Sequence, residues 1–317
     1  MNSLGAAGRV TGLYGWALAI AIFSAFGNLT ALCRVTTASL ISREIAMRKF
    51  IFRCFIALLF SASLLAQTFT NAPCTGEESN RNNSWFSGHQ ERVCELRSTT
   101  LPVIDGQVSL SGENGGIEVI GEERQDTALE ARVIVQDESR EKAESIEREI
   151  KIITTGTIHA EGPHTWGWSH GGWSVNYRLR VPRRVAAQLH TQNGGIQLTN
   201  VDGVIHADTT NGGLTLDDLG GDVHATTVNG GLDVKLGGSQ WRGNGLFAKS
   251  TNGGISVKAP EHYSAHLVAQ TVNGGISVGF PITIQGRIRN HIDTNIGQGG
   301  ATLQFETVNG GVSINPN

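Results

Sequence analysis

The sequence lacks the short motifs that mark several large classes of enzyme. No Gly-rich loop ends in Lys-Ser or Lys-Thr, and there is no nucleophile elbow and no His-Glu-x-x-His pair. The calcium-binding solenoid phrase, in which Gly and Asp alternate after Gly-Gly, is also missing. We therefore expect a protein that is not an enzyme, with no catalytic residue, no cofactor and no metal ion.

Positive charge is scarce beyond Ala66. The segment up to Ala66 holds six basic side chains and one acidic side chain, and the rest of the chain holds 19 basic and 27 acidic ones, a net charge of −8. Binding to a phosphate backbone relies on Lys and Arg. This mildly acidic composition argues against nucleic-acid binding.

Cysteine is also rare, with four in the whole chain. Cys33 and Cys54 precede Ala66, which leaves Cys74 and Cys94 for the rest. Two cysteines in an exported domain favour one disulfide, which would close the polar segment Thr75–Val93. Two unpaired thiols are the alternative.

Two apolar segments lie near the N-terminus. The run Trp16–Phe26 is apolar enough for a membrane helix. The second segment has a basic start at Met47, an apolar core at Phe50–Leu65 and the small residue Ala66. This order is typical of a secretory signal peptide.

These segments predict the domain organisation. Because a signal peptide begins a protein, we expect residues 1–46 to be an upstream extension, with a genuine membrane segment as the alternative, and residues 47–66 to be the signal peptide. Residues 67–99, rich in Asn, Ser, Glu and Arg, are expected to be a loosely ordered polar leader. Residues 100–317 form the main domain, exported to the periplasm, the outer surface or the extracellular medium.

One phrase recurs through the main domain: Asn-Gly-Gly, preceded by a small hydroxyl residue in most copies and followed by alternating apolar residues. The seven copies are headed by Asn114, Asn193, Asn211, Asn229, Asn252, Asn273 and Asn309. The copies at Asn193, Asn211 and Asn229 recur with a period of about 18 residues, and a second turn, Asn200–Gly203 against Asp218–Gly221, repeats with the same offset. Repetition at a fixed period is typical of stacked supersecondary units.

Each repeat predicts strand, tight turn, strand, because apolar and polar residues alternate on both sides of Asn-Gly-Gly. Asn and Gly tolerate positive φ, which suits such a turn. A meander of hairpins is the alternative for isolated units, but identical side chains at identical offsets favour coils stacked in register. The sequence therefore predicts an all-β fold, a single-stranded right-handed parallel β-solenoid (β-helix) with one short α-helix. The hand is taken from the rule for parallel crossovers.

The repeats carry a resemblance to a known family. The TVNGGISV phrases, the segment Leu179–Val185 (LRVPRRV) and the terminal GQGGATLQFETVNGGVSI resemble the bacterial putative-adhesin family of β-strand-repeat proteins of unknown function (DUF4097-like), which is related to the head domain of some autotransporter adhesins. The resemblance covers about residues 100–317. It implies an exported β-helix with an adhesive or envelope role, and no catalytic residues.

The two ends of the stack need protection. The run from Asp137 to Lys151 predicts a single short helix, Glu138–Glu149, with Asp137 as its cap. Its narrow apolar stripe is expected to lie across one open end of the solenoid. The other end, Thr307–Asn317, is expected to be an uncapped edge.

A segment rich in His and Trp, Ile158–Trp173, is a candidate ligand loop through His164, Trp166, Trp168 and His170. Exposed Trp rings suit stacking on sugars, and imidazoles ligate metals. The alternative, which we favour, is a hairpin loop whose rings cover the side of the solenoid, with Trp173 already in an ordinary strand.

Two groups of side chains within the repeats are weaker candidates for a metal or catalytic site. His206 and His224 are separated by one repeat, so that stacking would bring them together, but two ligands are fewer than a metal site usually has. Asp217, Asp218 and Asp222 cluster at the second turn, as for calcium or for acids that cleave polysaccharide. Since the neighbouring coil does not repeat them, we favour a solvated turn.

The main hypothesis is a non-catalytic solenoid that presents a repetitive surface for adhesion or cell-envelope interaction, with a cell-surface glycan or an envelope protein as partner. The alternatives are a scaffold that self-associates through its final edge and a polysaccharide-active β-helix enzyme. The seven asparagines are expected to form a structural turn column in which each amide bonds the next. Asn229→Ala is then expected to cost about 1–2 kcal/mol. Asn309→Ala is expected to cost less, because Asn309 lies near the chain end and is expected to have a neighbour on one side at most.

Overall fold

The computed structural model describes residues 68–74, 91–164, 172–281 and 290–317. The chain divides into two compact units, Met1–Ala66 and Gln67–Asn317, and every described residue belongs to the second. The expected upstream extension and signal peptide therefore lie outside the described residues. Within the described part, no helix has the length and apolarity needed to cross a membrane.

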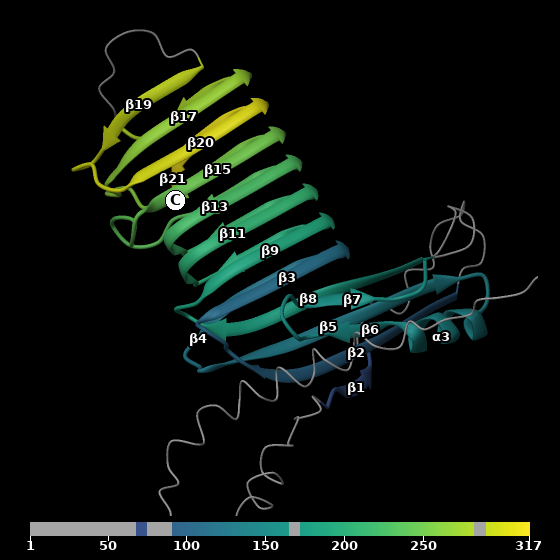
Figure 1. Cartoon of the computed structure of the whole chain (residues 1–317). Helices are drawn as coiled ribbons and strands as arrows, with labels where there is room; N and C mark the ends of the chain where they lie inside the picture. Colours follow the sequence, from purple (N-terminus) through teal and green to yellow (C-terminus); the bar gives the residue numbers. More distant parts are fainter. Residues whose placement is uncertain (1–67, 75–90, 165–171, 282–289) are drawn as a thin grey trace, which may run out of the picture. The chain divides into compact units, whose positions relative to one another are not determined.

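Most strands after residue 186 alternate between two sheets (Figure 1). Sheet B contains, in spatial order, β19 (His291–Ile296), β17 (Ala265–Asn273), β20 (Thr302–Asn309), β15 (Gly245–Asn252), β13 (Gly220–Asn229), β11 (Asp202–Asn211), β9 (Ala186–Asn193) and β3 (Gln107–Asn114). The repeat part of sheet A contains β4 (Ile117–Glu122), β10 (Ile196–Thr199), β12 (Leu214–Asp217), β14 (Leu232–Lys235), β16 (Ile255–Ala259), β21 (Val312–Pro316) and β18 (Ile276–Val278). One strand of sheet B, its Asn-Gly-Gly turn and the next strand of sheet A form a coil, and together the coils form the coil stack.

Neighbouring coils are parallel and in register. Val223 of β13 faces Ile205 of β11, and Asn229 faces Asn211; in sheet A, Leu232 faces Leu214. The side chains that point between the sheets are almost fully buried, as the alternation in the sequence predicts. The core therefore consists of columns of like residues. For the described residues, an all-β fold with one short helix and parallel strands in its sheets is confirmed.

The last coil in the chain is not the last coil in the stack. β20 lies between β15 and β17, and β21 lies between β16 and β18. The expectation that Thr307–Asn317 forms an uncapped edge is therefore wrong. The end of the stack is the coil β17–β18, where antiparallel β19 covers sheet B and β18 is left as the edge strand of sheet A.

The opposite edge of sheet A continues into long strands, here called the extension. It consists of β8 (Gly172–Pro182), which runs parallel to β4, and then β5 (Asp126–Asp137), β2 (Glu91–Pro102) and β1 (Thr70–Pro73), each antiparallel to its neighbour. The expectation of a loosely ordered leader over residues 67–99 is therefore wrong where the chain is described. Its polar residues alternate along β2, which pairs with β5 over its whole length.

The helix differs from the prediction in its start and in what it covers. α3 spans Arg140–Glu149, and Ser139 rather than Asp137 is its N-cap, with a hydroxyl that accepts from Lys142 N at 3.3 Å. It packs against β5 and β2 of the extension rather than against a coil. The first coil is instead bordered by β8 in sheet A and by Ile158 beside β3 in sheet B. The short antiparallel pair β6 (Lys151–Ile153) and β7 (His159–Glu161) lies between α3 and β8 in the sequence.

Candidate functional site

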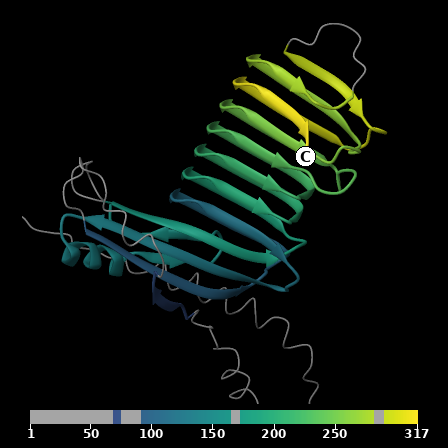
Figure 2. The ribbon, with the colours of Figure 1, turned by 180° about the vertical axis from the view of Figure 1, so that it is seen from behind.

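The seven motif asparagines stand in one column along the turns, visible as the aligned strand ends of sheet B in Figure 2. Six of the seven amides donate from Nδ2 to the Oδ1 of the asparagine in the adjacent coil, at 2.8–2.9 Å, and Asn114 at the end of the column accepts from Asn193. In stack order the column is Asn114, Asn193, Asn211, Asn229, Asn252, Asn309 and Asn273. Asn309 lies inside this column and has a partner on each side, so the expectation that it has one neighbour at most is wrong.

A second column of hydrogen bonds runs beside the first. The hydroxyl two residues before each asparagine donates to the carbonyl of the first glycine in the adjacent coil, as Thr227 Oγ1 does to Gly212 O at 2.8 Å. These hydroxyl residues are buried, with exposures of 0–3%. The column contains Thr191, Thr209, Thr227, Ser250, Thr307 and Thr271. Because a buried hydroxyl without an acceptor is costly, the Thr of the motif is a structural residue.

The glycines of the motif are required mainly by close approach. A Cβ at Gly212 would lie 2.0 Å from Gly194 O, inside the backbone of the neighbouring coil. None of the seven asparagines has positive φ, and among the motif glycines only Gly115 does. The expectation that the turn depends on positive φ is therefore wrong, and the coil spacing of about 4.8 Å sets the requirement instead.

Positive φ occurs at the second turn. Asn200 (φ 60°) and Asp218 (φ 49°) occupy the same place in successive coils. The Asp218 carboxylate lies 2.9 Å from Arg242 Nη1, and the Asp202 carboxylate lies 3.1 Å from Nη2 of the same arginine. Asp217, in turn, lies 3.4 Å from the Lys235 amine. These carboxylates are neutralised by cations of the chain, which argues against calcium binding or acid catalysis at this turn.

His206 and His224 lie side by side on the outer face of sheet B. Their rings are stacked, with centroids 5.3 Å apart and an interplanar angle of 6°, and Phe247 continues the column 5.8 Å from His224. Asp222 Oδ1 lies 3.3 Å from His224 Nε2. Within the described ranges, no group of three or more His, Cys, Asp or Glu side chains could hold a metal ion.

The candidate ligand loop is only partly described. Trp166, Trp168 and His170 lie outside the described residues, as does the string Gly-Trp-Ser-His-Gly around Ser169. That string has the spacing of a nucleophile elbow, but strand β8 follows it rather than the helix that an elbow requires. His164 is exposed, and Trp173 is half-buried in β8 with its Nε1 donating to Pro163 O at 2.9 Å.

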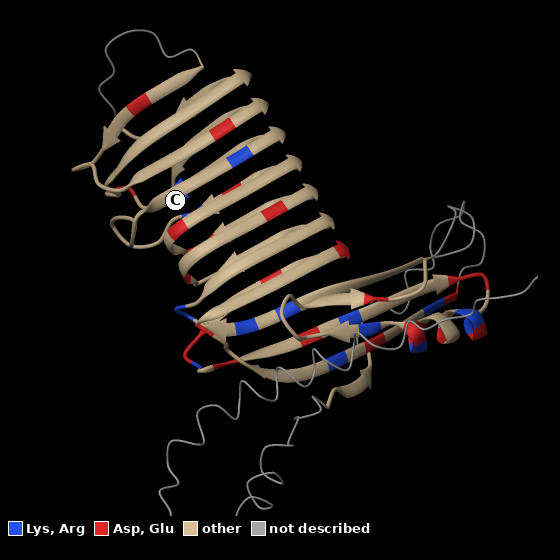
Figure 3. Ribbon diagram, viewed as in Figure 1, with Lys and Arg blue, Asp and Glu red and all other residues tan. Residues whose placement is uncertain are grey.

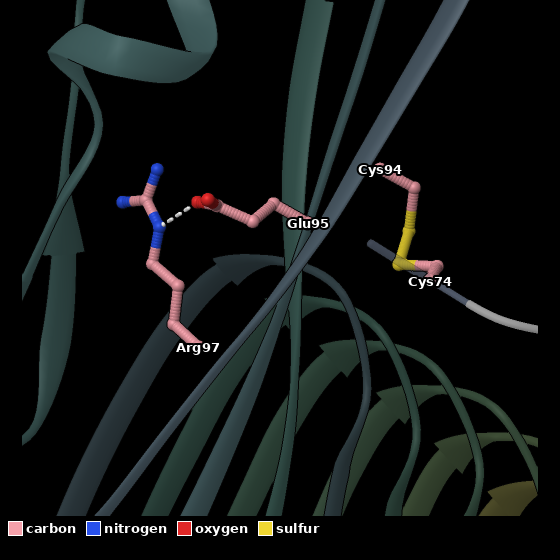
Figure 4. The surroundings of a disulfide bond; sticks show 4 residues. All are labelled: Cys74, Cys94, Glu95 and Arg97. Carbon is pink, nitrogen blue, oxygen red and sulfur yellow. Dashed lines mark hydrogen bonds and ion pairs between the residues drawn. A yellow bond between two sulfur atoms is a disulfide. The ribbon is translucent and has the colours of Figure 1, made fainter. Parts of the chain in front are cut away.

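A buried ion-pair cluster in the extension was not predicted. Arg97 of β2, 9% exposed, donates from Nε to Glu95 Oε2 at 2.5 Å and from Nη2 to Glu147 O at 2.9 Å and to the Glu147 carboxylate of α3. Its Nη1 donates to Ile150 O at 2.5 Å. Figure 4 shows Arg97 and Glu95, with the disulfide between Cys74 and Cys94 on the other side of β2. Together these contacts join α3, β1 and β2.

The two carboxylates of this cluster titrate in opposite directions. Burial raises the pKa of Glu147, and the hydrogen bond and negative charge of Glu95 raise it further. Burial also acts to raise the pKa of Glu95, but hydrogen bonds with Glu147 and Arg97 outweigh it, and the pKa falls. Of the two groups, Glu147 is therefore the one that takes up a proton first as the pH falls.

Two shallow depressions lie beside the second glycines of the turns on the outer side of sheet A, and together we call them the turn groove. The residues that define it are Gly116, Gly195, Gly213, Gly231, Gly254, Gly311 and Gly275. Its first part, about 480 Å³, includes Gly116, Gly195 and Gly213, and its second part, about 580 Å³, includes the other four. Tyr177 also lines the first part, and its buried hydroxyl has no acceptor among the described residues.

Outward side chains of sheet A form one wall of the turn groove. In stack order they are Glu118, Gln197, Thr215, Asp233, Ser256, Ser313 and Ser277. Sequence reasoning identified these as outward residues but did not single out the groove. The signal was present in the fixed spacing between the second glycine and the polar residue two positions later.

Comparison with solved structures finds low similarity. A putative cell adhesion protein from Clostridium sporogenes is 12% identical, with a TM-score of 0.37 and coverage of 72% of this chain and 100% of that chain. A putative adhesin from Bacteroides fragilis is 12% identical, with a TM-score of 0.33 and coverage of 70% and 97%. A putative lipid binding protein from Parabacteroides distasonis is 11% identical, with a TM-score of 0.27 and coverage of 71% and 96%. These values are too low to indicate a shared function.

Sequence comparison is more specific. No curated protein matches the chain. The family model described as Toastrack DUF4097 matches residues 183–315, from the end of β8 to β21. This segment holds six of the seven Asn-Gly-Gly turns, and the match confirms the resemblance drawn from the repeats. Residues 183–315 are therefore similar to the Toastrack DUF4097 family.

Proposed function

We propose that this protein is an exported, non-catalytic right-handed β-solenoid that presents repeated outer faces for adhesion or for interaction with the cell envelope. The observation that carries the proposal is the use of the motif side chains: each Asn, Thr and first Gly of the interior coils is engaged by a neighbouring coil. The motif residues are therefore used to hold neighbouring coils together. What remains for recognition is the outer surface of the two sheets.

That outer surface has features that support recognition. In Figure 3 few charged residues lie on the coil stack, whereas many lie on the extension and α3. Val204, Val228 and Val272 are exposed on sheet B, at 51%, 44% and 58%. Exposed apolar side chains on a face of low charge favour contact with another surface.

Binding to cells tests this proposal. The labelled full chain should bind saturably to intact bacterial cells or to isolated envelopes, and unlabelled protein should compete with it. Asn229→Ala should bind equally well below its melting temperature, because Asn229 acts inside the stack. Absence of saturable binding to both preparations would contradict an adhesive or envelope role.

Export has a separate test. The protein made from its native gene should begin near Gln67 if the predicted signal peptide is removed. N-terminal sequencing and peptide mapping measure this directly. A peptide from residues 10–43 in the mature product would show that the segment is retained as a membrane segment.

A self-associating scaffold is a second candidate, favoured by the open edge at β18. Among the described strands it pairs only with β21, so its other side could accept a strand from another copy. Growth of the purified protein with concentration, measured by light scattering, would support the scaffold. A constant monomeric mass would leave adhesion as the only candidate.

A further inference from the structure

The turn groove contains a column of unused backbone donors. The first glycine of each turn donates its N–H to the adjacent coil, as Gly212 does to Asn229 O at 3.0 Å, and the residue after the second glycine does the same, as Leu214 does to Gly231 O at 3.0 Å. The N–H of the second glycine between them has no protein acceptor among the described residues. This holds for Gly195, Gly213, Gly231, Gly254, Gly311 and Gly275, all of which are exposed.

The first coil shows which chemistry fits this column. There the N–H of the second glycine, Gly116, donates to the side-chain amide oxygen of Asn176 at 2.8 Å, and both residues line the groove. Because the coils are parallel and in register, the following N–H groups face the same side. An amide oxygen therefore accepts a hydrogen bond from the first N–H of this column, and the next six N–H groups have no such acceptor among the described residues.

The spacing of the donors selects the type of ligand. Successive coils are separated by about 4.8 Å, whereas carbonyls on one side of an extended peptide recur roughly every 6.6 Å. A peptide along the stack would lose register within a few coils. A β-1,4-linked chain of pyranose sugars advances by one ring over a length close to the coil spacing. Because successive rings face opposite ways, its acetamido groups face the groove at every second coil.

The side chains of the groove suit the same ligand. Thr215, Ser256 and Ser313 offer hydroxyls, and Gln197 offers an amide, all able to bond sugar hydroxyls. Sugar hydroxyls require donors and acceptors rather than a single sign of charge. The second part of the groove has one charged residue, Asp233. The first part is also lined by Arg92, Arg132 and Arg178, but Glu118 and Glu130 pair with Arg178 there, so the groove is not the strongly basic surface that a polyanion would need.

We propose that the turn groove binds a linear glycan whose sugars carry acetamido groups, laid along the axis of the coil stack. The acetamido oxygen takes the place that the Asn176 amide takes on Gly116, and ring hydroxyls meet the polar side chains of the wall. This site rests on the proposed recognition function and assigns it a ligand class and a location.

The test compares two sugars that differ in the acetamido group. The full chain is titrated by calorimetry with a β-1,4-linked hexamer of N-acetylglucosamine and with the β-1,4-linked glucose hexamer. The acetylated hexamer should bind at least ten-fold more tightly. Equal affinity for the two hexamers, or no binding of either, would overturn the proposal.

Matched variants locate the site. Ser256→Ile with Ser313→Ile replaces two hydroxyls of the groove by bulkier β-branched side chains and should weaken binding at least ten-fold. Thr251→Ile, an outward threonine of β15 on sheet B, should leave affinity unchanged. All variants must melt near the wild-type temperature, and Ser256→Ala with Ser313→Ala serves if the isoleucines unfold the chain. Equal weakening by Thr251→Ile would place the site outside the groove.

This outcome is distinct from that of the cell-binding test. Saturable binding to cells without affinity for the acetylated hexamer would contradict the glycan site and leave the recognition function standing. Binding of the hexamer that persists in the groove variants would likewise reject the groove.

Discussion

The coil stack and the extension both contain sheets that must be covered, and they are stabilised by different kinds of contact. In the coil stack one small set of contacts recurs at every level, so stability is spread over many equivalent bonds. In the extension, stability is concentrated in contacts that occur once. These are the Arg97 cluster, the Cys74–Cys94 disulfide and the packing of α3 on β2 and β5. A single substitution should therefore cost more in the extension than in the stack.

The largest effect is expected at Arg97. Arg97→Ala removes the buried cation between Glu95 and Glu147 and leaves two partly buried carboxyl groups and the Ile150 carbonyl without their donor. Breaking a buried ion pair costs about 3–5 kcal/mol. Urea unfolding measures the loss, with Arg178→Ala as the control. Arg178 forms an exposed pair with Glu118, worth at most about 1 kcal/mol. Similar losses in both variants would refute the contrast.

A smaller but clear effect is expected inside the stack. Gly212→Ala places a methyl group 2.0 Å from the Gly194 carbonyl, and the adjacent coils must move apart. Overpacking of this kind costs about 1–3 kcal/mol. Gly213→Ala is the matched control, because its Cβ lies 3.3 Å from the Gly231 carbonyl and needs only a small adjustment. If the two variants melted at the same temperature, close approach of the coils would not explain why the first position after the asparagine is glycine.

A third prediction concerns position within the asparagine column. Asn309→Ala removes bonds to Asn252 and Asn273, whereas Asn273→Ala removes only the bond to Asn309. With exposed amides, the first should cost about 1 kcal/mol, similar to Asn229→Ala, and the second roughly half as much. Thermal melts of the three variants test the order. If Asn309→Ala lost less thermal stability than Asn273→Ala, the position in the chain rather than the position in the stack would determine the cost.

The smallest effect is a pH dependence from the glutamate pair in the extension. The pKa of Glu147 is raised, so its protonated form stabilises the fold at low pH, and this stability is lost as pH rises from the ordinary Glu value of 4.5 through the raised pKa. The pKa of Glu95 is lowered, so its contribution is present above the ordinary value and is lost as pH falls through the lowered pKa.

The variant Glu147→Gln isolates the contribution of Glu147 to this pH dependence. Glutamine keeps the neutral shape of the protonated carboxyl and cannot titrate. Melting temperatures measured from pH 4 to pH 7 should fall in the wild type relative to this variant as pH rises. Parallel curves for the two proteins would show that Glu147 carries no raised pKa.

The contrast between the regions also explains what the sequence could predict. The strands, turns and asparagine column of the stack follow from a pattern repeated seven times, where Thr227 and Asn229 predict the places of Thr209 and Asn211. The register is set because a shift would misalign every column at once.

The extension could not be predicted in the same way. Arg97 and Glu147 are 50 residues apart and occur once, so no pattern indicates their contact. The polar composition of β2 hid a strand, since seven of its twelve residues are polar although it pairs with β5 over its whole length. The place of β20 was missed for a related reason. All coils carry the same motif, and the motif does not state their order in space.

The insertion of the last coil has a consequence for how the chain is synthesised. Coils from β9–β10 to β15–β16 can assemble in the order in which the ribosome delivers them, each on a finished neighbour. The coil β17–β18 emerges next, but its neighbour in the stack is β20–β21, which is made later. Until β20 and β21 emerge, β17 can form its lasting pair only with β19, and β18 has no lasting partner among the described strands. Completion of the coil stack is therefore tied to residues 302–316, and loss of this segment would leave two coils without the strands that join them.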